Sequence, residues 1–284
     1  MNSFQRVVKY CAIAFAVVLA VGIISGIVSA TIAVVSGIGS GFSSNEEDRK
    51  NFAENFSDVE RLDINNSTGT LEIKTGDTVR VEAENVRESF RAKVTGNGTL
   101  EIESDNNFID WINGFLNGNN PFKGEKITVY LPEELLLEKA FIDCGTGNVT
   151  IEKLNTERLE LNAGTGNMKA SDIVAQKADI DGGVGNIDLM NVSLTDAEID
   201  CGVGEMEIDG EILGHSSIDC GVGNVDIKLD GRYEDYDLDV ESGLGSVYIN
   251  GERVKETKKS NSQNDDLSLE VDGGLGNIRL DFAY

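Results

Sequence analysis

One short motif, Gly-x-Gly followed by a polar and then an aliphatic residue, occurs seven times in the second half of the chain. The first five copies begin 19 residues apart, and the last two gaps are 22 and 31 residues. A fixed period of this length is typical of a solenoid, in which each repeat buries its apolar face only against its neighbours. The copies begin at Gly145, Gly164, Gly183, Gly202, Gly221, Gly243 and Gly274.

Each copy of the motif is preceded by an alternating pattern. The positions five, three and one before the first glycine are apolar or small, and so is the position after it. In the third copy they are Ala178, Ile180, Gly182 and Val184. The position two before the glycine is polar in every copy. A period of two indicates a β-strand with one face toward a core and the other toward water, so we expect all four of these positions to face the core.

The second glycine and the asparagine that often follows it predict a corner, because both residues tolerate positive φ. A second short strand follows, and a further apolar residue closes several repeats (Leu154, Ile173, Val192 and Ile212). The pattern predicts an all-β fold, a single-stranded β-helix of about 19 residues per coil whose equivalent positions stack about 4.8 Å apart. A β-sandwich is the alternative, although sandwiches rarely keep a strict residue count for each strand pair.

The N-terminal region differs in character from the rest. Residues 10–35 are uncharged and apolar over a length that can span a bilayer as one α-helix. Arg6 and Lys9 precede them and acidic residues from Glu46 onward follow, which predicts a cytoplasmic N-terminus (1–9) and an extracytoplasmic C-terminal domain. The predicted location is therefore the cell membrane, with a single span. A cleaved signal peptide is the alternative, since Val28-Ser29-Ala30 suits a cleavage site.

Beyond the predicted span, residues 36–57 have the polar composition of a linker, and residues 58–284 form the predicted solenoid domain. An insertion at 104–126 interrupts the strands with an aromatic cluster. Four residues of this cluster have the spacing of one helical face: Phe108, Trp111, Ile112 and Phe115. Two interpretations stay open: the insertion covers part of the solenoid core, or it presents a patch to a partner or to the outer leaflet.

The chain is strongly acidic, with 50 acidic and 24 basic side chains. This charge argues against nucleic acid as a partner, which demands a basic surface. Carboxylates occupy the polar strand position in six repeats, and stacked coils would align them into a column: Asp143, Asp181, Asp200, Asp219, Glu241 and Asp272. The column either keeps a repetitive β protein soluble or binds a cation or a basic partner.

Calcium is the cation to consider for a column of oxygen ligands. The segment from Gly182 to Asp188 is close to a calcium-binding repeat, but its aspartate comes one residue late and the period of 19 is not a multiple of nine. We therefore expect no cofactor, with Ca²⁺ as the one ion to test. The position directly before the first glycine holds only small residues, which we expect to face the core. Three of them are cysteines: Cys144, Cys201 and Cys220. Either Cys201 and Cys220 form a disulfide between adjacent coils, or all three are small buried side chains.

Catalytic motifs are missing from the sequence. The single histidine, His215, has no nucleophile motif around it. From the aligned repeat positions we also expect no cluster of basic residues beside the acidic column. The Gly-x-Gly copies lack the lysine and the following helix of a phosphate-binding loop. We therefore predict that the protein is not an enzyme.

Four features in order resemble one family: the predicted membrane helix, the strands from Leu62 to Asp77, the segment from Ile127 to Pro132, and the glycine repeats. The chain is similar to the bacterial putative-adhesin family, a β-strand-repeat domain of unknown function, over residues 58–282. This resemblance implies a membrane segment before a β-solenoid, and it brings no catalytic residues. We predict a non-enzymatic interaction module of the cell envelope that binds an unknown envelope protein or glycan. The alternative is a surface adhesin for host or neighbouring cells, and a polysaccharide-active β-helix enzyme is a more distant one.

Overall fold

The computed structural model describes residues 49–104, 124–254, 257–258 and 267–283. The chain divides into two compact units, Met1–Asp48 and Arg49–Tyr284, and all described residues belong to the second. No helix among the described residues is long and apolar enough to cross a membrane. The predicted span at 10–35 lies outside them and stays a prediction.

The second unit is all-β, with 23 strands and one short 3₁₀ turn in its described part. The N-terminal strands are β1 (Arg49–Phe56), β2 (Arg61–Thr68), β3 (Thr70–Thr75), β4 (Val79–Arg87), β5 (Arg91–Val94), β6 (Thr99–Ser104) and β7 (Lys126–Leu131). The central strands are β8 (Leu136–Thr146), β9 (Val149–Ile151), β10 (Leu154–Thr165), β11 (Met168–Ser171), β12 (Ile173–Val184), β13 (Ile187–Thr195), β14 (Ala197–Val203), β15 (Met206–Leu213), β16 (His215–Val222) and β17 (Val225–Leu229). The turn η1 (Tyr233–Asp235) and the strands β18 (Asp237–Leu244), β19 (Val247–Ile249), β20 (Glu252–Val254), β21 (Thr257–Lys258), β22 (Ser268–Leu275) and β23 (Ile278–Phe282) follow.

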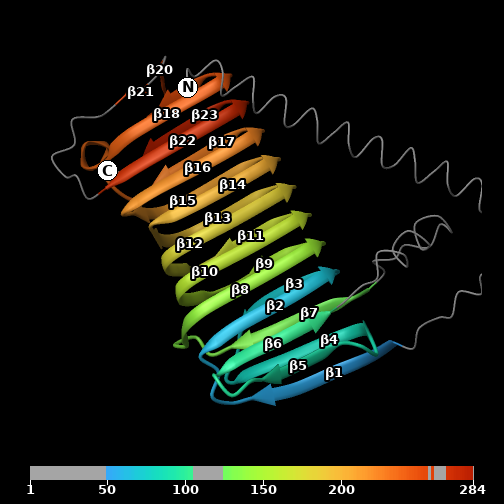
Figure 1. The fold of residues 1–284 in the computed structure, drawn as a ribbon. Helices are drawn as coiled ribbons and strands as arrows, with labels where there is room; N and C mark the ends of the chain where they lie inside the picture. Colours follow the sequence, from blue (N-terminus) through green and yellow to red (C-terminus); the bar gives the residue numbers. More distant parts are fainter. Residues whose placement is uncertain (1–48, 105–123, 255–256, 259–266, 284) are drawn as a thin grey trace, which may run out of the picture. The chain divides into compact units, whose positions relative to one another are not determined.

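Each central coil consists of a long bent strand, a corner and a second strand, and it pairs in parallel with the coils on both sides (Figure 1). Leu161 of β10, for example, is in register with Ile142 of β8 and Ile180 of β12. The second strands pair in the same way, β11 with β9 and β13. Equivalent repeat positions therefore form columns. This arrangement confirms the predicted β-solenoid and is not that of a sandwich.

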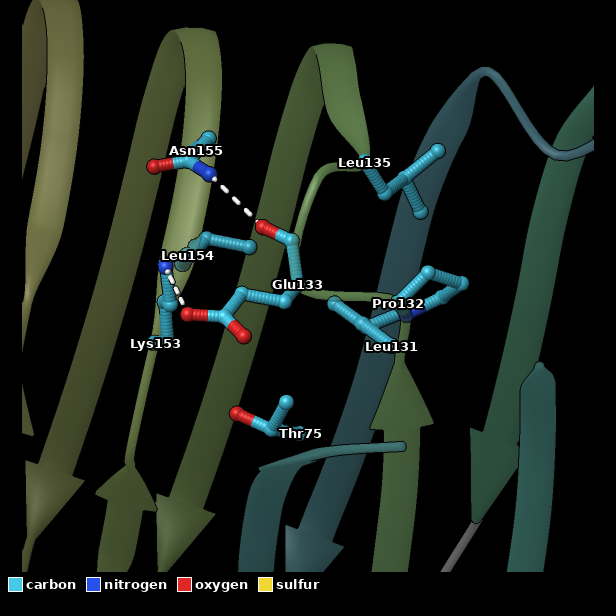
Figure 2. Close-up of a pocket in the computed structure, with 8 residues that line it drawn as sticks. All are labelled: Thr75, Leu131, Pro132, Glu133, Leu135, Lys153, Leu154 and Asn155. Carbon is cyan, nitrogen blue, oxygen red and sulfur yellow. Dashed lines mark hydrogen bonds and ion pairs between the residues drawn. The ribbon is translucent and has the colours of Figure 1, made fainter. Parts of the chain in front are cut away.

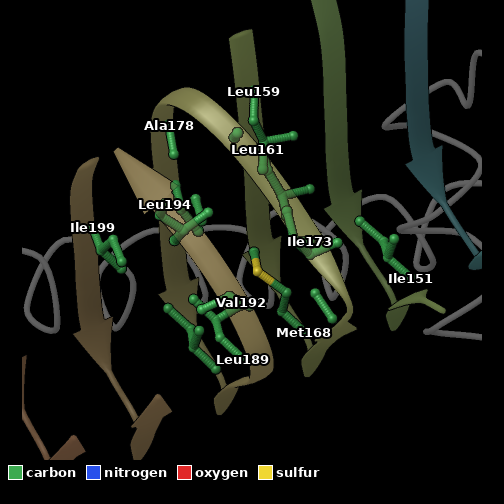
Figure 3. Close-up of a cluster of buried hydrophobic side chains, with 14 of the residues drawn as sticks. Ile151, Leu159, Leu161, Met168, Ile173, Ala178, Leu189, Val192, Leu194 and Ile199 are labelled. Carbon is green, nitrogen blue, oxygen red and sulfur yellow. The ribbon is translucent and has the colours of Figure 1, made fainter. Parts of the chain in front are cut away.

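Apolar side chains from three sides of each coil fill the interior (Figure 3). In the coil that begins with β12, the buried residues are Ala178 and Ile180 on the first side, Ile187 and Leu189 on the second, and Val192 and Leu194 on the third. The residues predicted to close the coils, Leu154, Ile173, Val192 and Ile212, are all buried. A continuous apolar interior of this kind is the main stabilising term for the fold.

The prediction for the residue between the two glycines is wrong. We expected it to face the core, but it points outward at the corner, and Val184, Val203 and Leu244 are 53%, 42% and 65% exposed. The chain begins to turn at the first glycine, so the alternation of the strand ends one residue earlier than the sequence pattern suggests. Because neighbouring coils are in register, the result is an outward-facing aliphatic row, exposed except at the half-buried Val222: Val184, Val203, Val222, Leu275 and Leu244.

The second glycine of each motif is required by close stacking of the backbone. Gly185 has a φ of 147°, and a Cβ atom there would lie 1.8 Å from the carbonyl oxygen of Gly166 in the preceding coil. The same contact recurs at the other corners. The predicted positive φ is confirmed, and the lack of space between coils adds a second reason why only glycine fits.

The asparagines at the corners link successive coils. The backbone N–H of Asn167 donates to Oδ1 of Asn148 at 3.1 Å, and that of Asn186 donates to Oδ1 of Asn167 at the same distance. This ladder is interrupted at Glu205, whose N–H donates to Asn186 but whose side chain has no hydrogen bond to a described residue. It resumes where the N–H of Asn277 donates to Oδ1 of Asn224.

The spatial order of the last coils differs from their order in the sequence. Strand β16 pairs with β22, and β22 pairs on its other side with β18. The second strands repeat this order, because β23 lies between β17 and β19. The C-terminal repeat is therefore an interior coil, and the repeat before it is the outermost one (Figure 1).

Antiparallel strands cover both ends of the stack. At the C-terminal end, β20 pairs with β19 and β21 pairs with β18. At the other end, β5 pairs with β6, β4 pairs with β7, and β1 pairs with β4. Strand β1 lies in the region that composition assigned to the linker, where the Phe52 ring packs against Phe90 with ring centroids 5.3 Å apart. Such caps shield the terminal edges from pairing with other chains.

Candidate functional site

The predicted acidic column exists as a row of in-register residues on the first side of the solenoid. Asp181 is in register with Asp200, and Asp200 with Asp219. Asp219 is followed by Asp272 and then by Glu241, because of the changed coil order. Asp143 belongs to the same row but is separated from Asp181 by Asn162. All six predicted residues therefore share one column, which we call the acidic ladder.

The acids of the ladder repel one another. The pKa of Asp181, Asp200 and Asp219 is raised in each case by loss of hydration and then by neighbouring carboxylates. For Asp219 the pKa rises to about 6, with repulsion from Asp272 and Asp200 as the next causes after loss of hydration. The Asp219 side chain still has an exposed surface, so water weakens both effects. The carboxylates of the ladder therefore repel one another, and a bound cation or basic partner would reduce this repulsion.

A different arrangement neutralises acids on the second side of the same coils. There Asp188 pairs with Lys169 at 3.5 Å, Asp209 pairs with Lys228 at 3.0 Å, and Asp226 pairs with Arg279 at 2.7 Å. Each of these pairs joins two coils. By contrast, Asp143, Asp181, Asp200 and Asp219 have no ion pair or hydrogen bond with a described residue. The fold thus neutralises acids in one row and leaves them facing each other in another.

The ladder does not form a chelating metal site. Within the described ranges, no group of three or more His, Cys, Asp or Glu side chains converges in a way that could hold a metal ion. The ladder acids stand side by side along the column rather than around a point. Specific Ca²⁺ binding requires six to eight converging oxygen ligands, so this geometry gives it no support.

A row of basic residues lies on the same side, which contradicts the expectation that no basic residues cluster there. Arg61 is in register with Lys139, Lys139 with Arg158, and Arg158 with Lys177. We call these four residues the basic row. Lys139, Arg158 and Lys177 occupy the position six before the first glycine, and Arg61, which precedes the seven copies of the motif, joins them through its register with Lys139. An alignment extended by one more position would have shown Lys139, Arg158 and Lys177.

The basic row borders a shallow groove with a volume of about 450 Å³. Its lining consists of Arg61, Glu138, Lys139, Glu157, Arg158, Gln176 and Lys177. Arg61 pairs with Glu138, and Lys139 pairs with Glu160 at 2.9 Å. The side chains of Arg158 and Lys177 have no ion pair or hydrogen bond with any described residue. The groove therefore contains two cations that are free to bind a ligand.

A second, smaller hollow lies where the chain leaves β7 (Figure 2). Its lining includes Glu133 and Lys153, whose carboxylate and ammonium groups are 2.6 Å apart, and Asn155, which donates to the Glu133 carbonyl oxygen at 3.2 Å. The volume is only about 10 Å³. This is at the lower limit for a single water molecule, so the hollow is a structural feature and not a ligand site.

The cysteines of the small inward column are buried and free in the structure. Cys201 and Cys220 are in register on neighbouring strands but are not joined. Burial, with repulsion from Asp143, raises the pKa of Cys144 to about 12. All three positions are consistent with small buried side chains, the second of the two interpretations. The aromatic cluster Phe108, Trp111, Ile112 and Phe115 lies outside the described residues.

Comparison with known proteins gives a family and a set of distant structural relatives. No curated protein matches the chain. A putative adhesin from Bacteroides fragilis is 17% identical, with 84% of this chain and 100% of that chain covered and a TM-score of 0.45. A putative cell adhesion protein from Clostridium sporogenes is also 17% identical, with 83% and 100% covered and a TM-score of 0.36. A putative lipid binding protein from Parabacteroides distasonis is 16% identical, with 83% and 97% covered and a TM-score of 0.37.

The family model gives the assignment. It is described as Toastrack DUF4097, and it matches residues 59–278, well over half of the chain. The match begins just before β2 and ends at the start of β23, so it covers the stack of coils except most of this last strand. This chain therefore belongs to the Toastrack DUF4097 family.

Proposed function

We propose that the protein is a membrane-anchored, extracytoplasmic interaction module of the cell envelope, without enzymatic activity. In this proposal residues 10–35 span the membrane and the solenoid lies outside the cytoplasm. The observation that carries the proposal is the contrast between the two sides of the coils. Acids on the second side are paired between coils, whereas the ladder residues Asp181, Asp200 and Asp219 face one another without a cationic partner among the described residues.

Neighbouring carboxylates with raised pKa values, as at Asp181, Asp200 and Asp219, are typical of a surface kept for binding. A partner with basic side chains would relieve the repulsion in the ladder, and electrostatic complementarity would also speed its association. The geometry supports contact along a line of several coils rather than at a point, because the ladder acids lie in one column. We therefore propose a partner that presents a basic strip to the first side.

Photo-crosslinking in living cells tests this proposal. A photoreactive residue at Asp179, which is exposed beside the ladder, should capture one partner in high yield. The triple variant Asp181→Asn, Asp200→Asn, Asp219→Asn should lose this capture. The matched control Asp188→Asn, Asp209→Asn, Asp226→Asn removes the same charge from the second side and should retain it. Equal capture by both triple variants would show that the ladder only provides solubility.

The location needs its own experiment. A C-terminal fusion to alkaline phosphatase, which is active only outside the cytoplasm, should be active in cells. The same fusion without residues 10–35 should be inactive. A fluorescent protein that matures only in the cytoplasm should give the opposite result at the same position. An active phosphatase after deletion of residues 10–35 would rule out this segment as the membrane or export signal.

A further inference from the structure

The basic row is unusual in so acidic a chain. The net charge is −26, yet Arg61, Lys139, Arg158 and Lys177 succeed one another in four neighbouring coils. Their strands β2, β8, β10 and β12 lie side by side (Figure 1). Because neighbouring strands are about 4.8 Å apart, the four cations repeat at that interval over roughly 14 Å. The row ends at the next coil, where Asp196 occupies the position equivalent to Lys177.

The balance of charge in the groove favours an anion. The lining contains the four cations and only two carboxylates, Glu138 and Glu157. Glu138 pairs with Arg61 at one end of the row. At the other end, Arg158 and Lys177 are exposed and lack a partner among the described residues. On the second side, by contrast, Lys169 and Lys228 are each paired with an aspartate.

We propose that the groove along the basic row binds a linear anionic polymer, one that carries a carboxylate or phosphate group on each unit. This inference rests on the proposed function, because it names a ligand class for the envelope module. Each unit of the polymer would bring one anion to the level of one coil. Arg158 would bind its anion through two guanidinium N–H groups, and Lys177 would contribute a point charge.

The surroundings of the row favour a narrow chain over a membrane surface. Beside the row, Glu160 on β10 and Asp179 on β12 face Glu198 on the neighbouring strand β14, and the acidic ladder lies beyond them. A broad anionic surface such as a lipid headgroup layer would meet these carboxylates together with the row and be repelled. A single chain in the groove would contact the cations and avoid most of the acids.

Binding measurements on the full 284-residue chain in mild detergent test the proposal. The probes are a polygalacturonate oligomer with carboxylates, polyphosphate with phosphates, and a neutral dextran as the negative control. We expect binding of at least one of the two anionic polymers, weakened by added salt, and none of dextran. Free galacturonate should bind far more weakly than its oligomer, because several anions act together only on a connected chain.

The variant Arg158→Gln with Lys177→Gln should lower the affinity for the bound polymer about tenfold or more. Neither side chain has a partner within the described part of the chain, so the fold should be intact. The matched control Lys169→Gln with Lys228→Gln changes the net charge equally on the second side and should leave the affinity within about twofold. Equal loss in both variants, or no loss in the first, would overturn the proposal. So would the absence of binding to either polymer together with an association with anionic vesicles that the Arg158→Gln, Lys177→Gln variant loses.

The two proposals can fail separately. If the purified chain binds the polymer through Arg158 and Lys177 while the phosphatase fusion is inactive, the groove has the inferred specificity but the extracytoplasmic location is wrong. If the fusion is active and the ladder captures a partner while no polymer binds, only the inference about the groove is wrong.

Discussion

Asp219 is in register with Asp272, although Glu241 occupies the equivalent position in the repeat that follows it in the sequence. The C-terminal repeat is thus inserted between two earlier ones. Its strands β22 and β23 each pair on both sides, so they belong to the interior of the stack.

Removal of the C-terminal repeat should therefore destabilise the domain more than loss of an end coil would. A chain that ends at residue 266 lacks β22 and β23 and leaves the edges of β16 and β18 without their partner. We expect a lower melting temperature and aggregation, measured by circular dichroism and light scattering. A peptide of residues 267–284 added in trans should restore part of the stability. Removal of Tyr284 alone is the control and should have no effect.

The acidic ladder predicts a pH dependence of stability. Asp219 has a pKa of about 6 in the folded state, above its ordinary value near 3.9, so the folded protein binds this proton more tightly than the unfolded one. This group therefore costs no stability below about pH 4, destabilises the fold increasingly between about pH 4 and pH 6, and has a constant cost at higher pH. We expect Asp219→Asn to raise the melting temperature at pH 8 but not at pH 4.

The control for this substitution is Asp226→Asn, which removes an acid paired with Arg279 at 2.7 Å. It should lower or leave unchanged the melting temperature at pH 8. A gain of the same size in both variants would attribute the effect to net charge and not to the ladder.

The interrupted asparagine ladder offers a stabilising substitution. Glu205 occupies the corner position that is an asparagine in the coils on both sides, Asn186 and Asn224. Glu205→Asn places an amide oxygen where it can accept from the N–H of Asn224. We expect about 1 kcal/mol of added stability in a urea titration, the typical net value of one hydrogen bond. Asn186→Ala, which removes an existing acceptor, should cost a similar amount. A neutral result for Glu205→Asn alone would show that the corner there has a different geometry.

The close approach of neighbouring corners predicts a severe effect of a small substitution. A Cβ at Gly185 would lie 1.8 Å from a backbone carbonyl oxygen, which cannot move without disturbing the next coil. Gly185→Ala should cost about 3 kcal/mol or more. Gly96→Ala is the matched control, because a Cβ there has no atom within 4 Å. Comparable stabilities of the two variants in urea would contradict this explanation of the motif.

Thiol accessibility provides a check on the interior. Cys144, Cys201 and Cys220 are buried and free, and the pKa of Cys144 is raised to about 12. Because burial keeps the reagent away from all three sulfur atoms, none of them should be labelled by a thiol reagent at pH 8 in the folded protein. All three should react after unfolding in urea without a reductant. Failure of Cys201 and Cys220 alone to react would reveal a disulfide between them.

The repeat by itself determined the local structure of each coil. Its spacing of 19 residues, the alternation around Ile180 and the small residues before the glycine predicted parallel coils with an acidic column on one side. These features are local, because each depends on how one strand presents its side chains and on how closely identical strands stack. The orientation of the residue between the two glycines was predicted wrongly. An aliphatic residue at this position is compatible both with a continued strand and with a corner, so the sequence pattern does not separate the two.

Only the tertiary structure decided which coils are neighbours and which surfaces result. All repeats carry nearly the same inward residues, so the sequence does not distinguish the pairing of β16 with β22 from pairing with β18. The long connection after Ile249 and the capping strands β20 and β21 decide that choice. The basic row likewise depends on Arg61, which enters the column only because β2 stacks on β8 from a distant part of the chain. Local pattern thus set the coil, and long-range stacking and end capping set the order of the coils and the charged surface.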